Sequence, residues 1–201
     1  MTARDISKVG ICGSGIMGSG LAEVIARSNK QVIVRSRSIA SASQMKAAVE
    51  KSLEKQVAKE KISQGDADRT LANITLTDNV GDLRDCDLVI ESIIEELEPK
   101  VALFKELDAL TNPDAILATN TSTLAVVELA RATNRPDKVC GIHFFNPATL
   151  MPLVEIIRPV TASDETIETA TAFASACGKE DRKSTRLNSS HIPLSRMPSS
   201  A

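Results

Sequence analysis

The chain has 201 residues, a formal net charge of −2 at pH 7, four Phe, no Trp and no Tyr. That length suits one domain with a substantial core, and the charge and the few aromatic residues argue against a nucleic-acid surface. No run of about 18 apolar residues predicts a membrane span, and the N-terminus lacks the apolar stretch of a signal peptide. We therefore expect a cytoplasmic protein with neither a membrane nor a nucleic acid as partner.

Short apolar runs alternate with helical patterns along most of the chain. Seven runs predict β-strands, at residues 8–12, 31–35, 74–77, 86–92, 115–119, 138–145 and 153–159. Helical patterns follow at residues 15–28, 38–63, 64–74, 98–110, 124–132 and 163–178. In the longest of them, four apolar residues share one stripe: Met45, Val49, Leu53 and Val57. This alternation predicts an α/β fold with a Rossmann-like, doubly wound, mostly parallel sheet.

The cysteines are widely spaced and form no C-x-x-C pair: Cys12, Cys86, Cys140 and Cys177. This spacing predicts reduced, mostly buried thiols rather than a disulfide framework or a zinc site. We therefore expect no bound metal.

The first predicted strand runs into a glycine-rich loop that opens a helix, Gly13-Ser14-Gly15-Ile16-Met17-Gly18. This G-x-G-x-x-G pattern, in that context, is typical of a dinucleotide-binding loop. Gly13 permits a tight turn, Gly15 lets the backbone approach a pyrophosphate, and Gly18 lets helix and strand pack closely. The helix N-terminus would hold the diphosphate. A purely structural glycine-rich turn is the alternative.

The second predicted strand ends in "VIVRSRS", where an NAD site usually carries an acid for the ribose 2′-OH. Ser36 occupies that position, between Arg35 and Arg37. The absent carboxylate removes repulsion against a 2′-phosphate, and two guanidinium groups could bind one. Two interpretations stay open here: an NADP site, or an NAD site beside solvent-facing arginines.

Apart from His191, the chain has one histidine, His143, near the carboxyl end of a predicted strand. Glu155 follows within the next apolar strand, where a buried carboxylate needs a partner. A histidine held by a carboxylate near a nicotinamide can take a proton from an alcohol as hydride leaves. The alternative is a core histidine bound to a backbone carbonyl, with Glu155 at an exposed edge.

Four motifs, in this order and spacing, resemble the NAD-binding domain of the 3-hydroxyacyl-CoA dehydrogenases: "GSGIMGSG", "DLVIESIIEELEPKVALFKELD", "ATNTSTL" and "HFFNP…LVEII". The resemblance covers residues 6–180 and is nearest to the bacterial 3-hydroxybutyryl-CoA dehydrogenases. It implies an NAD-dependent oxidoreductase that oxidises (3S)-3-hydroxyacyl-CoA to 3-ketoacyl-CoA, in fatty-acid or butanoate metabolism. Ser36 departs from the Asp usual in the family, so that NADP stays possible.

The resemblance also implies roles for particular residues. His143 would be the general base, Glu155 would orient it, and Ser122 would hydrogen-bond the reacting oxygen and contact the cofactor. Further cofactor contacts would come from three residues: Glu95, Lys100 and Asn146. Coenzyme A would be contacted by a helical insertion over residues 39–72, through Ser52 and Lys59. Seven-residue spacing puts that last pair on one helix face.

The last part of the chain, residues 181–201, differs from the rest. Its segments "DRKSTRLNSSH" and "SRMPSSA" resemble a translated sequencing adapter, the alternative being a Ser-rich disordered terminus. We expect residues 1–180 to form the NAD(P)-binding domain and the remainder to be non-native or disordered. The resemblance implies that an all-helical C-terminal domain, which forms the homodimer, is missing. We therefore expect a truncated chain with weak or no activity, or a module that binds a dinucleotide without catalysis.

Overall fold

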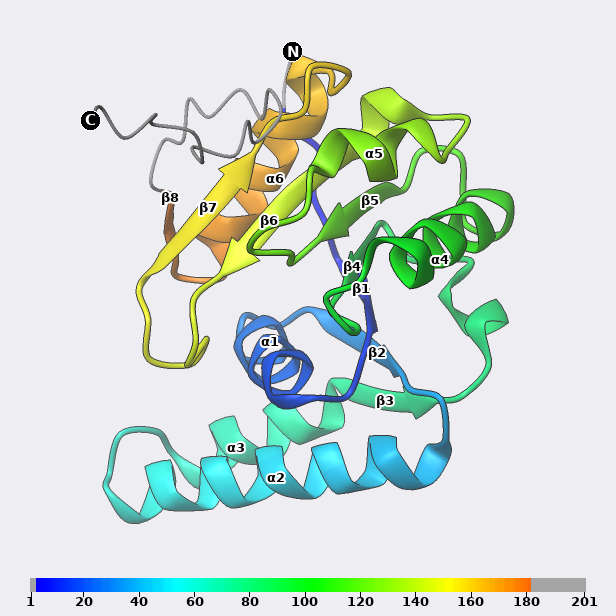
Figure 1. The fold of residues 1–201 in the computed structure, drawn as a ribbon. Helices are drawn as coiled ribbons and strands as arrows, with labels where there is room; N and C mark the ends of the chain where they lie inside the picture. The colour runs from blue at the N-terminus through cyan, green and yellow to red at the C-terminus, as the bar shows by residue number, and fades with distance from the viewer. Residues whose placement is uncertain (1–2, 182–201) are drawn as a thin grey trace, which may run out of the picture.

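The structure, a computed structural model, describes residues 3–181 (Figure 1). These residues form one eight-stranded sheet of order β3-β2-β1-β4-β5-β6-β7-β8. Its strands are β1 Lys8–Cys12, β2 Gln31–Arg35, β3 Ile74–Thr77, β4 Leu88–Glu91, β5 Ile116–Thr119, β6 Val139–Phe144, β7 Leu153–Ile157 and β8 Glu180–Asp181. The α-helices are α1 Ile16–Arg27, α2 Ile39–Ala58, α3 Gln64–Ala72, α4 Leu97–Leu110, α5 Val126–Arg131 and α6 Asp164–Ala176. Single 3₁₀ turns lie at Val80–Leu83 and Pro136–Lys138.

The strand order confirms the predicted doubly wound, mostly parallel sheet. Every neighbouring pair is parallel except β6 and β7, which are antiparallel. β1 lies between β2 and β4, so the chain reverses its direction of winding there. In open α/β sheets, ligands bind at the carboxyl ends of the strands beside such a reversal.

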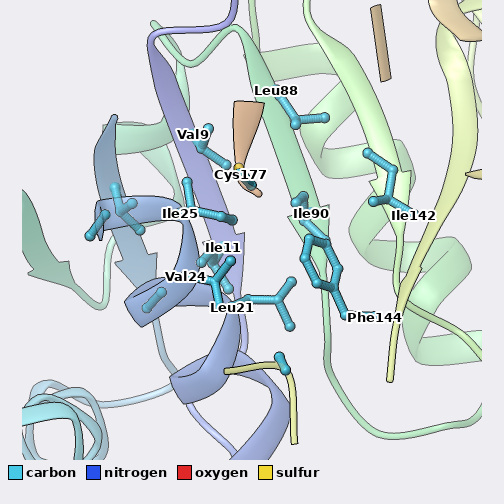
Figure 2. Packing of buried hydrophobic residues seen from close by; sticks show 14 of the residues in the cluster. Val9, Ile11, Leu21, Val24, Ile25, Leu88, Ile90, Ile142, Phe144 and Cys177 are labelled. Atoms are coloured by element: carbon cyan, nitrogen blue, oxygen red, sulfur yellow. The ribbon is translucent and has the colours of Figure 1, made fainter. Parts of the chain in front are cut away.

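Helices cover both faces of the sheet, as Figure 1 shows. The core on one face joins α1, α2, α3 and α6 to the strands, and the core on the other joins α4 and α5 to them. In Figure 2, Leu21 and Ile25 of α1 lie near Val9 and Ile11 of β1, all fully buried. Burying one such aliphatic side chain stabilises the fold by about 1.5–3 kcal/mol, so α1 is firmly fixed below the loop that precedes it.

The long helix predicted over residues 38–63 is shorter in the structure. α2 ends at Ala58, and Glu60 adopts a left-handed backbone with φ of 55° that breaks the helical path. α3 then starts from a capping box, in which Ser63 and Asp66 each accept a bond from the other's backbone N–H. The second predicted helix, over residues 64–74, is thus confirmed as α3, and the end of the first was predicted five residues too late.

The described chain ends in a strand that the sequence did not predict. Glu180 and Asp181 pair with Leu153 and Val154 of β7, and the Asp181 carboxylate accepts a bond from the Ile156 N–H. Asp181 therefore lies in the sheet, although we expected it to belong to the tail. The expectation for the tail otherwise lies outside the described residues.

The cysteines are free and buried, which confirms the predicted reduced thiols. Burial raises the pKa of Cys12 and of Cys140 to about 12, so both are protonated and unreactive at neutral pH. Among residues 3–181, no helix is both long and apolar enough to cross a membrane.

Candidate active site

The loop between β1 and α1 has the geometry predicted for a dinucleotide loop. Gly13 has φ of +127°, and a Cβ there would lie 2.3 Å from the carbonyl oxygen of Ser92. A Cβ on Gly18 would lie 2.1 Å from the Gly13 oxygen. Both positions therefore require glycine: one for the turn beside the loop after β4, the other for the contact between helix and loop.

Gly15 differs from these two glycines, because a Cβ there would meet nothing within 4 Å. It is the N-cap of α1, makes no side-chain capping bond, and is followed by a first turn without acidic residues. Within residues 3–181, no side chain caps the first backbone N–H groups of α1, and the space beside Gly15 is open. Unpaired N–H groups and the positive end of the helix dipole make this a site for a diphosphate.

A cavity of about 790 Å³ opens above this loop, at the carboxyl ends of β1, β2, β4 and β5. Eleven of the predicted cofactor residues line it: Gly13, Ser14, Gly15, Ile16, Met17, Arg35, Ser36, Arg37, Glu95, Lys100 and Ser122. Gly18 lies beneath the loop, and exposed Asn146 in the loop after β6 is not among the lining residues. The volume and the open approach at Gly15 fit an extended dinucleotide.

Sequence reasoning missed five residues that line this cavity: Ser92, Ile93, Ile94, Pro99 and Asn120. All five lie just after β4 or β5, or at the start of α4. The available signal was their position at the carboxyl ends of predicted parallel strands, where ligands bind.

A buried ion pair forms the floor of the cavity. Glu91, at the end of β4, is fully buried, and its carboxylate accepts bonds from the Lys100 ammonium and the Thr119 hydroxyl. Lys100 is itself 1% exposed and lies 3.1 Å from a carboxylate oxygen of Glu95. The Lys100 ammonium thus bridges two carboxylates, and its charge is neutralised before any ligand arrives.

Glu95 connects this floor to the loop after β5. Its carboxylate accepts bonds from the Thr121 hydroxyl, from the Ser122 N–H at 3.0 Å and from Thr123. Burial raises the pKa of Glu95, but the hydrogen bonds from Thr121 and Lys100 outweigh it and leave the pKa below its ordinary value. Glu95 therefore stays ionised and fixes the backbone that carries Ser122.

His143 and Glu155 are cross-strand neighbours in the antiparallel β6–β7 pair. The Nδ1 atom of His143 lies 3.3 Å from Oε2 of Glu155, and both side chains are partly exposed. An ionised carboxylate only accepts, so Nδ1 donates the hydrogen and Nε2 is left to accept a proton. The Phe145 ring packs on the imidazole, with its centroid 4.8 Å away. His143 and Glu155 therefore contact each other as predicted, and within residues 3–181 the His143 ring makes no bond to a backbone carbonyl.

Ser122 and His143 lie after and within the neighbouring strands β5 and β6. The Asn120 side-chain oxygen accepts a bond of 2.8 Å from the Phe144 N–H and so joins the two segments. No hydrogen bond between the Ser122 and His143 side chains occurs in the described part of the chain, and His143 does not line the 790 Å³ cavity. The structure therefore brings the two residues to one edge of the sheet without joining them.

A second cavity, of about 570 Å³, lies along α2. Ser52 and Lys59 both line it, which confirms that they share one helix face. Further basic residues surround them: Arg27, Lys51, Lys55 and Lys61. None of the ion pairs within residues 3–181 involves the lysines of this cavity, so its charge is available to an anionic ligand.

Comparison with known proteins places this geometry in a family. Residues 8–181 match the family model described as the NAD-binding domain of 3-hydroxyacyl-CoA dehydrogenase. A 3-hydroxybutyryl-CoA dehydrogenase of Mycobacterium tuberculosis is 40% identical over 171 residues, which are 85% of this chain and 60% of that protein. One of Bradyrhizobium diazoefficiens is 39% identical over 178 residues, 89% of this chain and 61% of that protein.

A solved structure shows the same likeness. The (S)-3-hydroxybutyryl-CoA dehydrogenase of Ralstonia eutropha superimposes with a TM-score of 0.86 at 36% identity, over 88% of this chain and 62% of that one. The chain thus spans about 60% of the length of the curated relatives it matches. The matched residues include the phosphate loop, the floor of the cavity and the His143–Glu155 pair, and on that match the chain belongs to the 3-hydroxyacyl-CoA dehydrogenase family, of which it carries the NAD-binding domain.

Proposed function

We propose that this chain serves the oxidation of a (3S)-3-hydroxyacyl-CoA, with 3-hydroxybutyryl-CoA as the preferred substrate, to the 3-ketoacyl-CoA. The observation that carries the proposal is the His143–Glu155 contact of 3.3 Å at the same sheet edge as the dinucleotide loop. The relatives named 3-hydroxybutyryl-CoA dehydrogenase support the substrate. Such a reaction belongs to fatty-acid or butanoate metabolism.

The reaction needs a hydride acceptor and a proton acceptor. A nicotinamide dinucleotide held over the glycine-rich loop would supply the first, as the acceptor of a hydride from C3 of the substrate. Nε2 of His143 takes the hydroxyl proton, and Glu155 holds the ring and stabilises its charged form. Ser122, whose backbone is held by Glu95, hydrogen-bonds the reacting oxygen. Asn146 is exposed beside β6 and would contact the nicotinamide end.

The acyl carrier fits the second cavity. Coenzyme A carries phosphate groups, and the cavity along α2 presents five basic side chains around Ser52: Arg27, Lys51, Lys55, Lys59 and Lys61. Guanidinium and ammonium groups at a concave surface favour such anions. The homodimer and the cytoplasmic location that the sequence implied stay predictions.

A module that binds a dinucleotide without catalysis is the second candidate. The observation that favours it is the absence of His143 and Asn146 from the lining of the dinucleotide cavity among the described residues. In that case the chain would bind NADH through its glycine-rich loop and turn over nothing.

One pair of measurements on the 201-residue chain tests both candidates. NADH binding is followed by fluorescence, and acetoacetyl-CoA-dependent oxidation of NADH is followed by absorbance. We expect NADH binding with weak turnover, and a His143→Gln variant that keeps NADH binding should lose about 10²–10⁴-fold of that turnover, the usual contribution of a general acid–base residue. An Arg131→Gln variant, changed on the exposed end of α5, is the matched control. Near-normal turnover in His143→Gln would refute the mechanism, and NADH binding without any turnover would favour the module.

A further inference from the structure

The carboxyl end of β2 is fixed against the dinucleotide loop. The carbonyl oxygen of Arg35 accepts a bond of 2.9 Å from the Gly13 N–H, and the Ser36 N–H donates to the Thr77 oxygen at 3.0 Å. The hydroxyl of Ser36 lies 2.7 Å from that of Ser14, within the loop itself. Residues 35–37 are therefore held at the end of the cavity where the adenosine ribose of a dinucleotide lies.

Among residues 3–181, none of the residues that line this end of the cavity carries a carboxylate. An NAD site uses an acid here to accept bonds from the ribose 2′-OH, but the residue present is Ser36, which is 5% exposed. Glu95 is the only acid among the described residues that line the cavity, and it is bound to Lys100 and to the loop after β5. The first turn of α2, which follows residue 38, also lacks acidic residues. Nothing in this lining would repel an anion at the ribose.

The positive charges of the lining are distributed unequally. Lys100 is paired with two carboxylates. Arg35 and Arg37 also line the cavity, yet neither forms an ion pair with any carboxylate of residues 3–181. The Nε atom of Arg35 is buried and has no hydrogen-bond partner in the same set of residues. An unpaired buried donor is destabilising on its own, so this one favours a ligand that supplies an acceptor.

We propose that Ser36, Arg35 and Arg37 bind the 2′-phosphate of NADP(H), so that this chain binds NADPH more tightly than NADH. A phosphate monoester carries a charge of about −1.5 to −2 at pH 7 and three acceptor oxygens. Two guanidinium groups and a hydroxyl match that group in charge and in donors. NADH offers them only a neutral hydroxyl and leaves both arginines unpaired. The inference rests on the proposed dinucleotide cavity, and it departs from the cofactor that the family description names.

Direct binding tests this inference without any catalysis. NADPH and NADH are titrated into the 201-residue chain at equal ionic strength, by calorimetry or by nicotinamide fluorescence. We expect the Kd of NADPH to be about tenfold lower or more, as charge-assisted hydrogen bonds imply. Added salt should weaken NADPH binding more than NADH binding, because the extra contact is ionic. A Kd for NADH equal to or below that of NADPH would overturn the inference and leave the proposed function intact.

Variants identify the residues that are responsible for the expected preference for NADPH over NADH. Arg37→Ala, at an exposed position, should raise the Kd of NADPH about tenfold or more and that of NADH less than about threefold. Ser36→Asp should reverse the preference, because a carboxylate repels the phosphate and accepts from the ribose hydroxyl, whereas Ser36→Ala should not. Arg131→Ala is the matched control, and thermal melting verifies that each variant is folded. If Arg37→Ala weakened both cofactors equally, the arginine would not read the phosphate and the inference would fail. If the parent chain bound neither cofactor, this inference and the proposed function would fail together.

Discussion

Two acid–base pairs at the carboxyl ends of the strands are built in opposite ways. Lys100 and Glu91 are 1% and 0% exposed, and further donors from Thr119 and the Ile93 N–H saturate the carboxylate. His143 and Glu155 make a single contact of 3.3 Å with side chains 15% and 23% exposed. The first pair belongs to the structure that supports the cavity, and the second is accessible from the surface.

The difference in exposure determines what the loss of one partner costs in each pair. Taking charges out of water is costly, so a buried pair persists only when each partner is compensated, and removing one partner leaves an uncompensated buried charge. A partly exposed pair loses little when one partner changes protonation. Of the two pairs, the accessible His143–Glu155 pair is the one that suits the proton acceptor of the proposed reaction, and the comparison predicts a large loss of stability when the buried pair is broken and a small loss when the exposed pair is changed.

The largest effect on the free energy of unfolding is expected from Lys100→Met. It removes the only cation that faces Glu91 among the described residues and leaves a buried carboxylate without compensation. We expect the free energy of unfolding to fall by about 3–5 kcal/mol, measured by urea denaturation. The control is Arg131→Ala, which breaks an exposed pair with Glu128 and should cost less than about 1 kcal/mol. Equal losses in the two variants would contradict the comparison.

A double variant shows whether the loss of stability comes from the missing Lys100–Glu91 attraction or from the Glu91 charge that is left buried without a partner. With Glu91→Leu added to Lys100→Met, no charge remains buried, and apolar replacements of buried pairs are often neutral. The Ile93 N–H and the Thr119 hydroxyl lose an acceptor, and partly exposed Glu95 loses its ammonium partner, so we expect the double variant to lie within about 2 kcal/mol of the parent protein. A double variant less stable than Lys100→Met would show that the attraction within the ion pair, and not the unpaired buried charge, accounts for the loss of stability.

A smaller effect is expected from Glu95, which lies between the two extremes at 41% side-chain exposure. Its pKa is lowered from an ordinary value of 4.5, so its contribution to stability is present above pH 4.5 and is lost as the pH falls through the lowered value. Glu95→Gln should cost about 1–2 kcal/mol at pH 7, after allowance for solvent screening, and make unfolding less dependent on pH below 4.5. Urea denaturation at pH 7 and at pH 3.5 measures the loss of stability and its pH dependence. If Glu95→Gln left the pH dependence of unfolding unchanged, this carboxylate would not be the source of that dependence.

Much of the fold and part of the site followed from local patterns. The phosphate loop was predictable because Gly13 and Gly18 are required by the local backbone, Gly13 for its positive φ and Gly18 for the close contact between helix and loop. The His143–Glu155 contact was predictable because a carboxylate in an apolar strand must find a partner. Glu91 in "LVIE" gave the same signal, but its partner lies on α4, and only the packed structure shows which helix turns toward the strand. The family resemblance implied that Asn146 contacts the cofactor, and this stays a prediction, because the loop after β6 leaves Asn146 outside the cavity lining formed by residues 3–181.

The smallest effect on stability is expected from Glu155→Gln. The pair it changes is partly exposed, and a glutamine oxygen still accepts from Nδ1 of His143, so the free energy of unfolding should change by less than about 1 kcal/mol. Turnover with acetoacetyl-CoA should nevertheless fall, because a neutral amide no longer stabilises the charged imidazole that donates the proton to the substrate oxygen in this direction. Denaturation and turnover are measured on the same preparation, with Glu128→Gln on α5 as the control. A loss of stability as large as that of Lys100→Met would place both pairs in the same structural class and remove the reason for choosing His143 as the proton acceptor.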